Sequence, residues 1–173
     1  MLMIDKPVSI GDGDQALHGS LVVPEGDGQR DAVLIWSGSG PTDRDGNSKL
    51  GLNNNSLKML AHALGEAGYI TLRTDKRGIG ESASAMKDES DLRLETYVDD
   101  AILWGRFLKD APNVRNIFLL GHSEGGLIAT LTAQSIKAAG LILLAAVGFP
   151  ANRPAHSNLN RFSNSPERFP RMG

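Results

Sequence analysis

A serine that stands between two glycines, directly after an apolar run, is the residue in this sequence best placed to act as a nucleophile. Gly121, His122, Ser123, Glu124 and Gly125 fit the pattern G-x-S-x-G. Between a strand and a helix this pattern forms a sharp turn that exposes the serine hydroxyl, and the flanking glycines avoid collisions with neighbouring backbone. The backbone N–H of Glu124 and the helix N-terminus would then face an oxyanion on an acyl group. The alternative is that Ser123 only caps the following helix.

A second oxyanion donor is expected from the loop that follows an earlier strand. Residues 37–47 read SGSGPTDRDGN, and the small residues at the start of this stretch permit a close approach to the serine. We assign the donor to the backbone N–H of Ser39, and Pro41 cannot donate because it has no N–H. The alternative is a phosphate-binding turn, although the stretch matches neither G-x-G-x-x-G nor a Walker motif.

A third glycine-containing loop, residues 74–82 (TDKRGIGES), follows another apolar run. Gly78, Gly80 and Ala83 spell G-x-G-x-x-A, which is one form of a dinucleotide-binding motif. The residues that come next are polar and show no apolar periodicity, so no helix is expected to open where a pyrophosphate would need one. A nucleotide site is therefore not favoured, and no cofactor is expected.

These three motifs, GSGPTDRDGN, TDKRGIGES and GHSEGG, resemble in their order and spacing the α/β-hydrolase fold, and within it bacterial esterases of the dienelactone hydrolase and serine aminopeptidase type. The resemblance covers most of the chain. It implies a Ser-His-Asp triad, a two-donor oxyanion hole and ester hydrolysis through an acyl-enzyme. Carried over by position, Ser123 is the nucleophile, and Glu124 and Ser39 supply the backbone donors.

Two groups of charged residues near these loops are expected to be structural. The resemblance implies that Asp75 and Arg77, with the neighbouring glycines, shape a loop at the edge of the active-site face. Asp43, Arg44 and Asp45 either brace their own loop by mutual pairing or contact the substrate. We favour the brace, because charge pairs in loops are usually structural.

The acid and base that would activate Ser123 have no clear place in this chain. In this fold the triad follows the order Ser, then Asp or Glu, then His, on later strands of the sheet. Only one strand is expected after Ser123, His156 is the only downstream histidine, and Glu124 is the only acidic residue between the two. We therefore expect a C-terminally truncated hydrolase with impaired activity. The alternative is a non-catalytic α/β module that binds a small acyl or anionic ligand or a partner chain.

The other histidines are not expected to serve as the base. His18 lies near the start of a strand, and His62 lies on the polar side of a helix. His122 is expected to point away from Ser123 and to act as a packing residue. No pair of histidines has metal-ligand spacing and the chain has no cysteine, so no metal site is expected.

Composition limits the class of protein. The chain has 173 residues, 40% of them hydrophobic, and a formal net charge of −2. We expect a single core domain over residues 1–149 and an irregular tail, rich in Pro, Asn and Arg, over residues 150–173. The sequence has no basic stripe for nucleic acid and no apolar run long enough for a membrane span. These features predict a cytoplasmic protein, and the resemblance implies that its partner is a small-molecule ester.

Short apolar runs alternate with helical patterns, which predicts an α/β fold: a mostly parallel, α/β-hydrolase-like sheet flanked by helices and lacking the last strands. Strands are expected at residues 16–23, 32–36, 69–74, 116–120 and 141–147, with a weaker strand at 7–10. Helices are expected at residues 55–67, 93–109 and 124–138. The last three strands are apolar nearly throughout, which is typical of strands covered on both faces. The final strand would have an unpaired edge, which predicts a homodimer or poor solubility.

Overall fold

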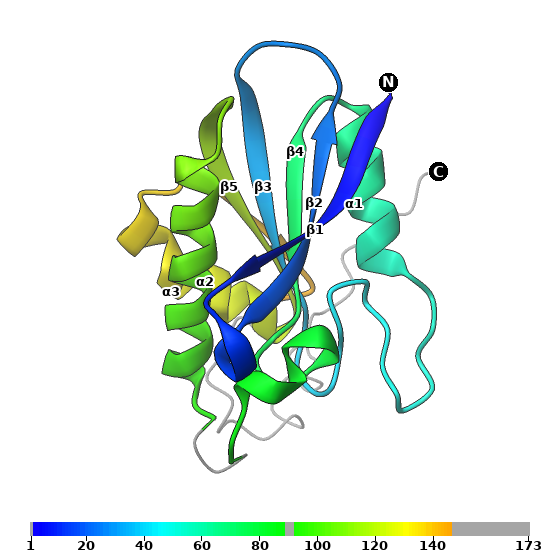
Figure 1. The fold of residues 1–173 in the computed structure, drawn as a ribbon, viewed down its shortest axis with the longest axis vertical. Helices are drawn as coiled ribbons and strands as arrows, with labels where there is room; N and C mark the ends of the chain where they lie inside the picture. Colours follow the sequence, from blue (N-terminus) through cyan, green and yellow to red (C-terminus); the bar gives the residue numbers. More distant parts are fainter. Residues whose placement is uncertain (1, 89–91, 147–173) are drawn as a thin grey trace, which may run out of the picture.

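The computed structural model describes residues 2–88 and 92–146, in which strands alternate with helices (Figure 1). In chain order the elements are β1 (Met3–Ile10), η1 (Gly13–Gln15), β2 (Leu17–Pro24), β3 (Arg30–Trp36), α1 (Ser56–Glu66), β4 (Ile70–Thr74), η2 (Gly80–Ala85), α2 (Leu94–Asp110), β5 (Val114–His122), α3 (Glu124–Ile136) and β6 (Gly140–Leu144). The expected tail over 150–173 and its His156 lie outside the described residues. None of the helices in the described ranges combines the length and apolar character that crossing a membrane requires.

The strands form one mixed sheet of six strands in the order β1-β2-β4-β3-β5-β6. β3 pairs in parallel with β4 and with β5, and β5 pairs in parallel with β6. β2 is antiparallel to both of its neighbours, β1 and β4. The predicted mostly parallel α/β sheet is therefore confirmed, with an antiparallel hairpin at its N-terminal edge.

Most of the expected elements are present, and the differences lie at the two edges of the sheet. Each of the five main strands and three helices predicted from the apolar pattern overlaps an observed element. β1 is longer than the weak strand expected at residues 7–10. Five of its eight residues are exposed and polar side chains interrupt its apolar pattern, so the sequence did not predict its full length. The expected absence of a helix after TDKRGIGES is wrong in part, because η2 forms a short 3-10 helix there.

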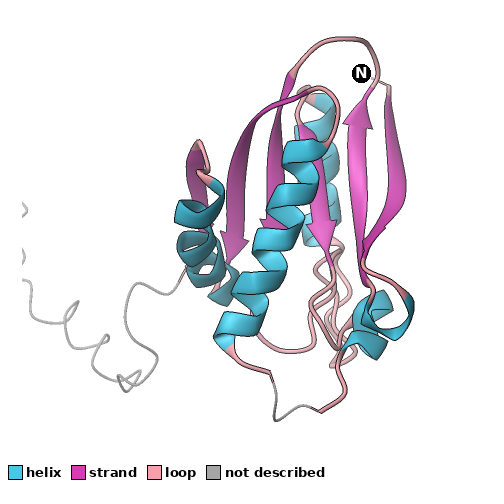
Figure 2. Cartoon of the chain, turned by 60° about the vertical axis from the view of Figure 1, so that its left-hand side comes forward, coloured by secondary structure: helices cyan, strands magenta, loops and turns pink. Residues whose placement is uncertain are grey.

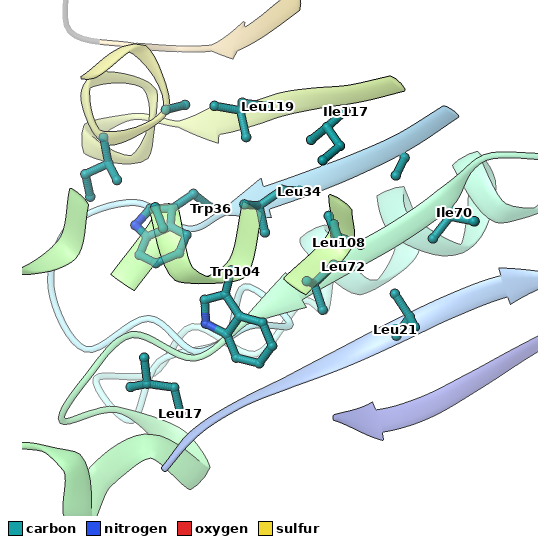
Figure 3. Close-up of a cluster of buried hydrophobic side chains, with 14 of the residues drawn as sticks. Leu17, Leu21, Leu34, Trp36, Ile70, Leu72, Trp104, Leu108, Ile117 and Leu119 are labelled. Carbon is teal, nitrogen blue, oxygen red and sulfur yellow. The ribbon is translucent and has the colours of Figure 1, made fainter. Parts of the chain in front are cut away.

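Two layers of helices cover the sheet, with α2 and α3 on one face and α1 on the other (Figure 2). The alternation of β3 divides its side chains between these layers, with Leu34 and Trp36 facing α2 and α3 while Ile35 faces α1. Trp104 of α2 is fully buried near the centre of the larger cluster (Figure 3). Burial of each large apolar side chain contributes about 1.5–3 kcal/mol. This packing fixes β3 and β5 against one another.

β6 differs from the expectation that the last three strands are covered on both faces. Its four large apolar side chains, Leu141 to Leu144, are 36–50% exposed. β6 stands at the end of the strand order, so among the described residues no strand pairs with its outer edge. An apolar run was a correct signal for a strand here, but it did not reveal how much of the strand would be covered.

The parallel arrangement brings three loops to one end of the sheet. The carboxyl ends of β3, β4 and β5 point the same way, and the loops that follow β3 and β4 gather below the sheet in Figure 2. The register pairs Trp36 with Gly121. The residues that follow these two are therefore neighbours, although about 85 positions separate them along the chain.

Candidate active site

Ser123 forms the turn between β5 and α3, and its backbone is strained. Its φ of 53° and ψ of −120° lie in a region that L-residues rarely adopt. The side chain makes no capping hydrogen bond to α3, which speaks against the alternative that this serine only caps the helix. Its N–H donates instead to the Leu144 carbonyl oxygen at 2.9 Å.

The glycines on either side of Ser123 are required by close backbone packing. A Cβ at Gly121 would overlap the backbone of Gly125 and Gly126. A Cβ at Gly125 would lie 2.5 Å from the Trp36 carbonyl oxygen, nearer than real Cβ atoms come to other heavy atoms. The turn can therefore pack against the end of β3 only because both positions lack a side chain.

The loop that follows β3 passes directly beside Ser123. A Cβ built on Gly38 would lie 3.1 Å from His122 Nδ1 and 3.3 Å from Ser123 Cβ. Ser39, the next residue, is exposed, and no other described residue accepts a hydrogen bond from its N–H. The N–H of Glu124 belongs to the first turn of α3, where backbone donors have no partner within the helix. Within the described ranges, the segments that carry Ser39 and Glu124 both adjoin Ser123, and neither N–H has a hydrogen-bond acceptor.

These residues line a depression of about 390 Å³ at the end of the sheet. Its walls come from the loop after β3, the start of α1 and the turn after β5. The lining residues are Gly38, Ser39, Thr42, Gly46, Leu52, Asn54, Ser56, Leu57, His122 and Ser123. His122 is exposed and faces this space, so our expectation that it is a packing residue is wrong. The expectation assumed that the regular alternation of β5 continues through His122, but this alternation ends at the turn.

A buried lysine supports the loop from below, and the sequence did not reveal it. Lys76 is only 2% exposed, and its Nζ donates to the carbonyl oxygens of Gly38 and, at 2.9 Å, Gly40. It also lies 5.9 Å from the centre of the Tyr97 ring. Burial lowers the pKa of Lys76 from its ordinary value of 10.5, and attraction to Glu124 opposes that shift.

Asp75 has the structural role in its loop that the resemblance implied, because its carboxylate ties the loop after β3 to η2. The Asp75 carboxylate accepts the N–H of Arg44 at 2.8 Å and of Glu81 at 3.0 Å, and it pairs with the Arg44 guanidinium at 3.0 Å. Burial raises the pKa of Asp75, and the two backbone hydrogen bonds oppose this. The carboxylate fills the position at η2 that a phosphate would need, which disfavours a nucleotide there.

Asp43 binds within its own loop, whereas Asp45 reaches another element. Asp43 accepts the backbone N–H groups of Asp45 and Asn47 at 2.9 and 2.8 Å. Asp45 lies 3.2 Å from the buried guanidinium of Arg73 in β4. The mutual pairing that we expected of residues 43–45 occurs only between the Asp43 carboxylate and the Asp45 N–H, while the Arg44 and Asp45 side chains pair with residues outside this stretch.

Of the other histidines, His62 lies away from the depression and His156 lies outside the described residues. His62 Nε2 lies 2.7 Å from Asp5 Oδ2 of β1, so it belongs to another part of the molecule. Within residues 2–88 and 92–146, no group of three or more His, Cys, Asp or Glu side chains is arranged to hold a metal ion. Also within these ranges, no side chain accepts a hydrogen bond from the Ser123 hydroxyl.

Comparison with known proteins places this arrangement in a family context. Residues 51–169 match the family described as serine aminopeptidase, S33. Esterase EstD of Thermotoga maritima is 34% identical over 139 residues, which is 80% of this chain and 31% of that protein. This chain therefore spans about a third of the length of its curated relative.

Solved structures give the same fold. The α/β hydrolase GrgF from Penicillium sp. sh18 superposes with a TM-score of 0.63 at 25% identity, over 83% of this chain and 46% of that one. Dienelactone hydrolase from Anabaena variabilis superposes with a TM-score of 0.64 at 20% identity, over 83% of this chain and 64% of that one. The six-stranded sheet with its flanking helices is thus an α/β-hydrolase sheet.

Proposed function

Because the chain belongs to the serine aminopeptidase S33 family of hydrolases, we propose that it acts on carboxylic esters with Ser123 as the nucleophile. The observation that carries this proposal is the strained backbone of Ser123 (φ 53°, ψ −120°) without a capping hydrogen bond. Such strain persists only where the surrounding structure enforces it, and it is concentrated at functional sites. The names of two relatives, an esterase and a dienelactone hydrolase, support ester chemistry.

The reaction follows from where the donors lie. Ser123 Oγ attacks the ester carbonyl carbon, and the carbonyl π electrons move to the oxygen. The N–H groups of Ser39 and Glu124 donate to this oxyanion, which lowers the barrier because the donors are already oriented. Collapse of the intermediate breaks the bond to the alcohol, which leaves with the proton from the serine. Water then releases the acid from the acyl-enzyme.

The proton transfer needs a base that the described residues do not place at Ser123. In this fold the acid and base follow the nucleophile along the chain, and EstD is about three times as long as this chain. Full triad chemistry is accordingly a proposal for the complete protein. An oxyanion hole without a triad retains roughly 10³–10⁴-fold catalysis over water. We therefore expect slow turnover of activated esters such as p-nitrophenyl acetate by this chain.

The depression limits the size of the substrate. Its volume of about 390 Å³ lies at the lower end of the range of roughly 300–1,000 Å³ that is usual for small-molecule sites. Leu52 and Leu57 offer apolar contact, while Thr42 and Asn54 offer hydrogen bonds. We propose a small ester with both apolar and polar parts.

A fluorophosphonate probe tests the proposal directly. The probe forms a bond from phosphorus to an activated serine oxygen and expels fluoride, and intact-mass and peptide-mapping measurements locate the adduct. We expect modification at Ser123, none in Ser123→Ala, and normal modification in Ser135→Ala, which removes an exposed hydroxyl from the same helix. If the folded wild-type chain is not modified, the alternative of a non-catalytic module that binds a small acyl or anionic ligand is favoured.

A further inference from the structure

We propose that Lys76 is a positioning residue that directs the Ser39 N–H toward the oxyanion through the peptide group that joins Gly38 to Ser39. This inference rests on the proposed function, because it assigns a role within the same site. It concerns a residue that does not line the depression and does not touch the substrate.

The contacts of Lys76 fix two carbonyl groups of the loop. Lys76 follows β4 by two residues, and its side chain runs beneath the neighbouring loop after β3, where it is 2% exposed. Its ammonium group donates to the Gly38 carbonyl oxygen and, at 2.9 Å, to the Gly40 carbonyl oxygen. Hydrogen bonds from a charged donor are roughly twice as strong as neutral ones. Both carbonyls are therefore held facing the interior.

Because the peptide group is planar, the hydrogen bond from Lys76 to the Gly38 carbonyl also fixes the direction of the Ser39 N–H. The Gly38 C=O and the Ser39 N–H belong to one trans peptide group, so they point in opposite directions. Since Lys76 holds the carbonyl toward the interior, the N–H must point away from Lys76. Gly38, Ser39 and Ser123 line the depression, whereas Lys76 is buried and does not line it, so we infer that the direction away from Lys76 leads into the depression. The lysine thus aims the N–H into the depression and also polarises it.

The residue that carries the second proposed donor, Glu124, interacts electrostatically with the same ammonium group. The carboxylate of Glu124 is close enough to Lys76 to oppose the effect of burial on the pKa of the lysine. Glu124 also carries the backbone N–H at the start of α3. Lys76 thus bonds directly to the loop that holds one donor, and its charge attracts the side chain of the residue that holds the other.

A simpler role for Lys76 is to satisfy two carbonyl oxygens that would otherwise be buried without partners. That role affects the stability of the fold, but it does not affect the rate of bond formation in chains that remain folded. The two roles are distinguished by measuring the maximal rate of modification, kinact, and the apparent affinity of the probe, KI, separately.

The test compares fluorophosphonate modification of the wild type, Lys76→Met and the control Lys87→Met, which changes an exposed lysine eleven positions further along the chain. Loss of a single oxyanion donor lowers rates by about 10²–10³-fold. Because Lys76→Met misdirects a donor rather than removing it, we expect kinact to fall by about 10-fold to 10²-fold with KI within about 3-fold. The control should react like the wild type. A folded Lys76→Met variant with wild-type kinact would overturn the inference.

Two further measurements cover the remaining outcomes. If Lys76→Met does not fold, Lys76→Gln is used instead, because it keeps one donor group that reaches only one of the two carbonyls. We expect kinact of this variant to fall by at least about 3-fold, and an unchanged kinact would contradict the positioning role. If the wild type is not modified at all, the proposed function fails, and the inference is then judged by amide hydrogen exchange of residues 37–41. Faster exchange in the folded lysine variant would support it, and unchanged exchange would contradict it.

Discussion

The strain at Ser123 can be measured by comparing two substitutions that both remove the nucleophile. Ser123→Ala keeps a Cβ at a backbone conformation of φ 53° and ψ −120°, whereas Ser123→Gly removes it. Because the serine side chain makes no capping hydrogen bond, neither variant loses one. The difference in unfolding free energy between the two variants therefore isolates the effect of the Cβ on the backbone.

The expected difference follows from two opposing terms. A non-glycine residue in such a region costs on the order of 1–3 kcal/mol. Glycine loses more conformational freedom on folding than alanine, which destabilises it by roughly 0.5–1 kcal/mol. We therefore expect Ser123→Gly to be more stable than Ser123→Ala by about 1 kcal/mol. In a chain of this size that corresponds to a rise in Tm of about 2–4 °C.

The assay is urea and thermal unfolding followed by circular dichroism, with a second pair of variants as the control. Ser135 is exposed in the last turns of the same helix α3, where glycine is less favourable than alanine by up to about 1 kcal/mol. At position 135 the order must therefore reverse, with the alanine variant more stable. If Ser123→Gly were no more stable than Ser123→Ala, the strain and the proposal built on it would be refuted.

Three other substitutions test the site, an ion pair and the sheet edge. Gly125→Ala places a Cβ 2.5 and 2.6 Å from two backbone carbonyl oxygens. We therefore expect the free energy of unfolding in urea to fall by about 1–3 kcal/mol or more and the probe to react more slowly, and wild-type values would contradict the close contact at Gly125. Burial is the largest influence on Asp5 and raises its pKa, but His62 and Arg73 together outweigh burial and lower the pKa below 3.8. The stability that the Asp5 carboxylate contributes is therefore present above pH 3.8 and is lost as the pH falls through the folded pKa. In thermal unfolding scans Asp5→Asn should reduce the fall in Tm at acid pH, and a dependence of Tm on pH equal to that of the wild type would contradict this. We also propose that the chain self-associates through β6; Ile142→Lys should then shift sedimentation toward monomer, and a wild type that remains monomeric at high concentration would contradict the proposal.

The arrangement of elements was largely predictable, because it depends on local periodicity. Apolar runs of five to eight residues marked β2 to β5, and apolar spacing marked α1 to α3. Burial was less predictable where it depends on neighbours in space. β4 contains two threonines and an arginine, yet every one of its residues is buried, whereas β6 has four large apolar side chains and most of it is exposed. β4 lies inside the strand order and β6 at its end, and no local pattern encodes that difference.

The site was predictable where its chemistry depends on backbone shape and less so where it depends on distant side chains. Glycines at 121 and 125 signalled the tight turn, and the structure gives the steric reason for each. Lys76 carried no such signal, because a lysine in a polar loop after a strand is usually solvated. Its importance arises from the carbonyls of Gly38 and Gly40, which approach it only after β3 and β4 pair.

A backbone hydrogen bond links the strained serine to the exposed edge strand. The N–H of Ser123 donates to the carbonyl of Leu144, the last residue of β6, so the edge strand helps to hold the turn in its unfavourable conformation. Edge strands with exposed side chains open at lower free energy than central strands. Any group that covers or pairs with β6 therefore also stabilises the backbone of the nucleophile. The reactivity of Ser123 should accordingly rise when β6 is held in place, whether by a second copy of the chain or by further strands of the same protein.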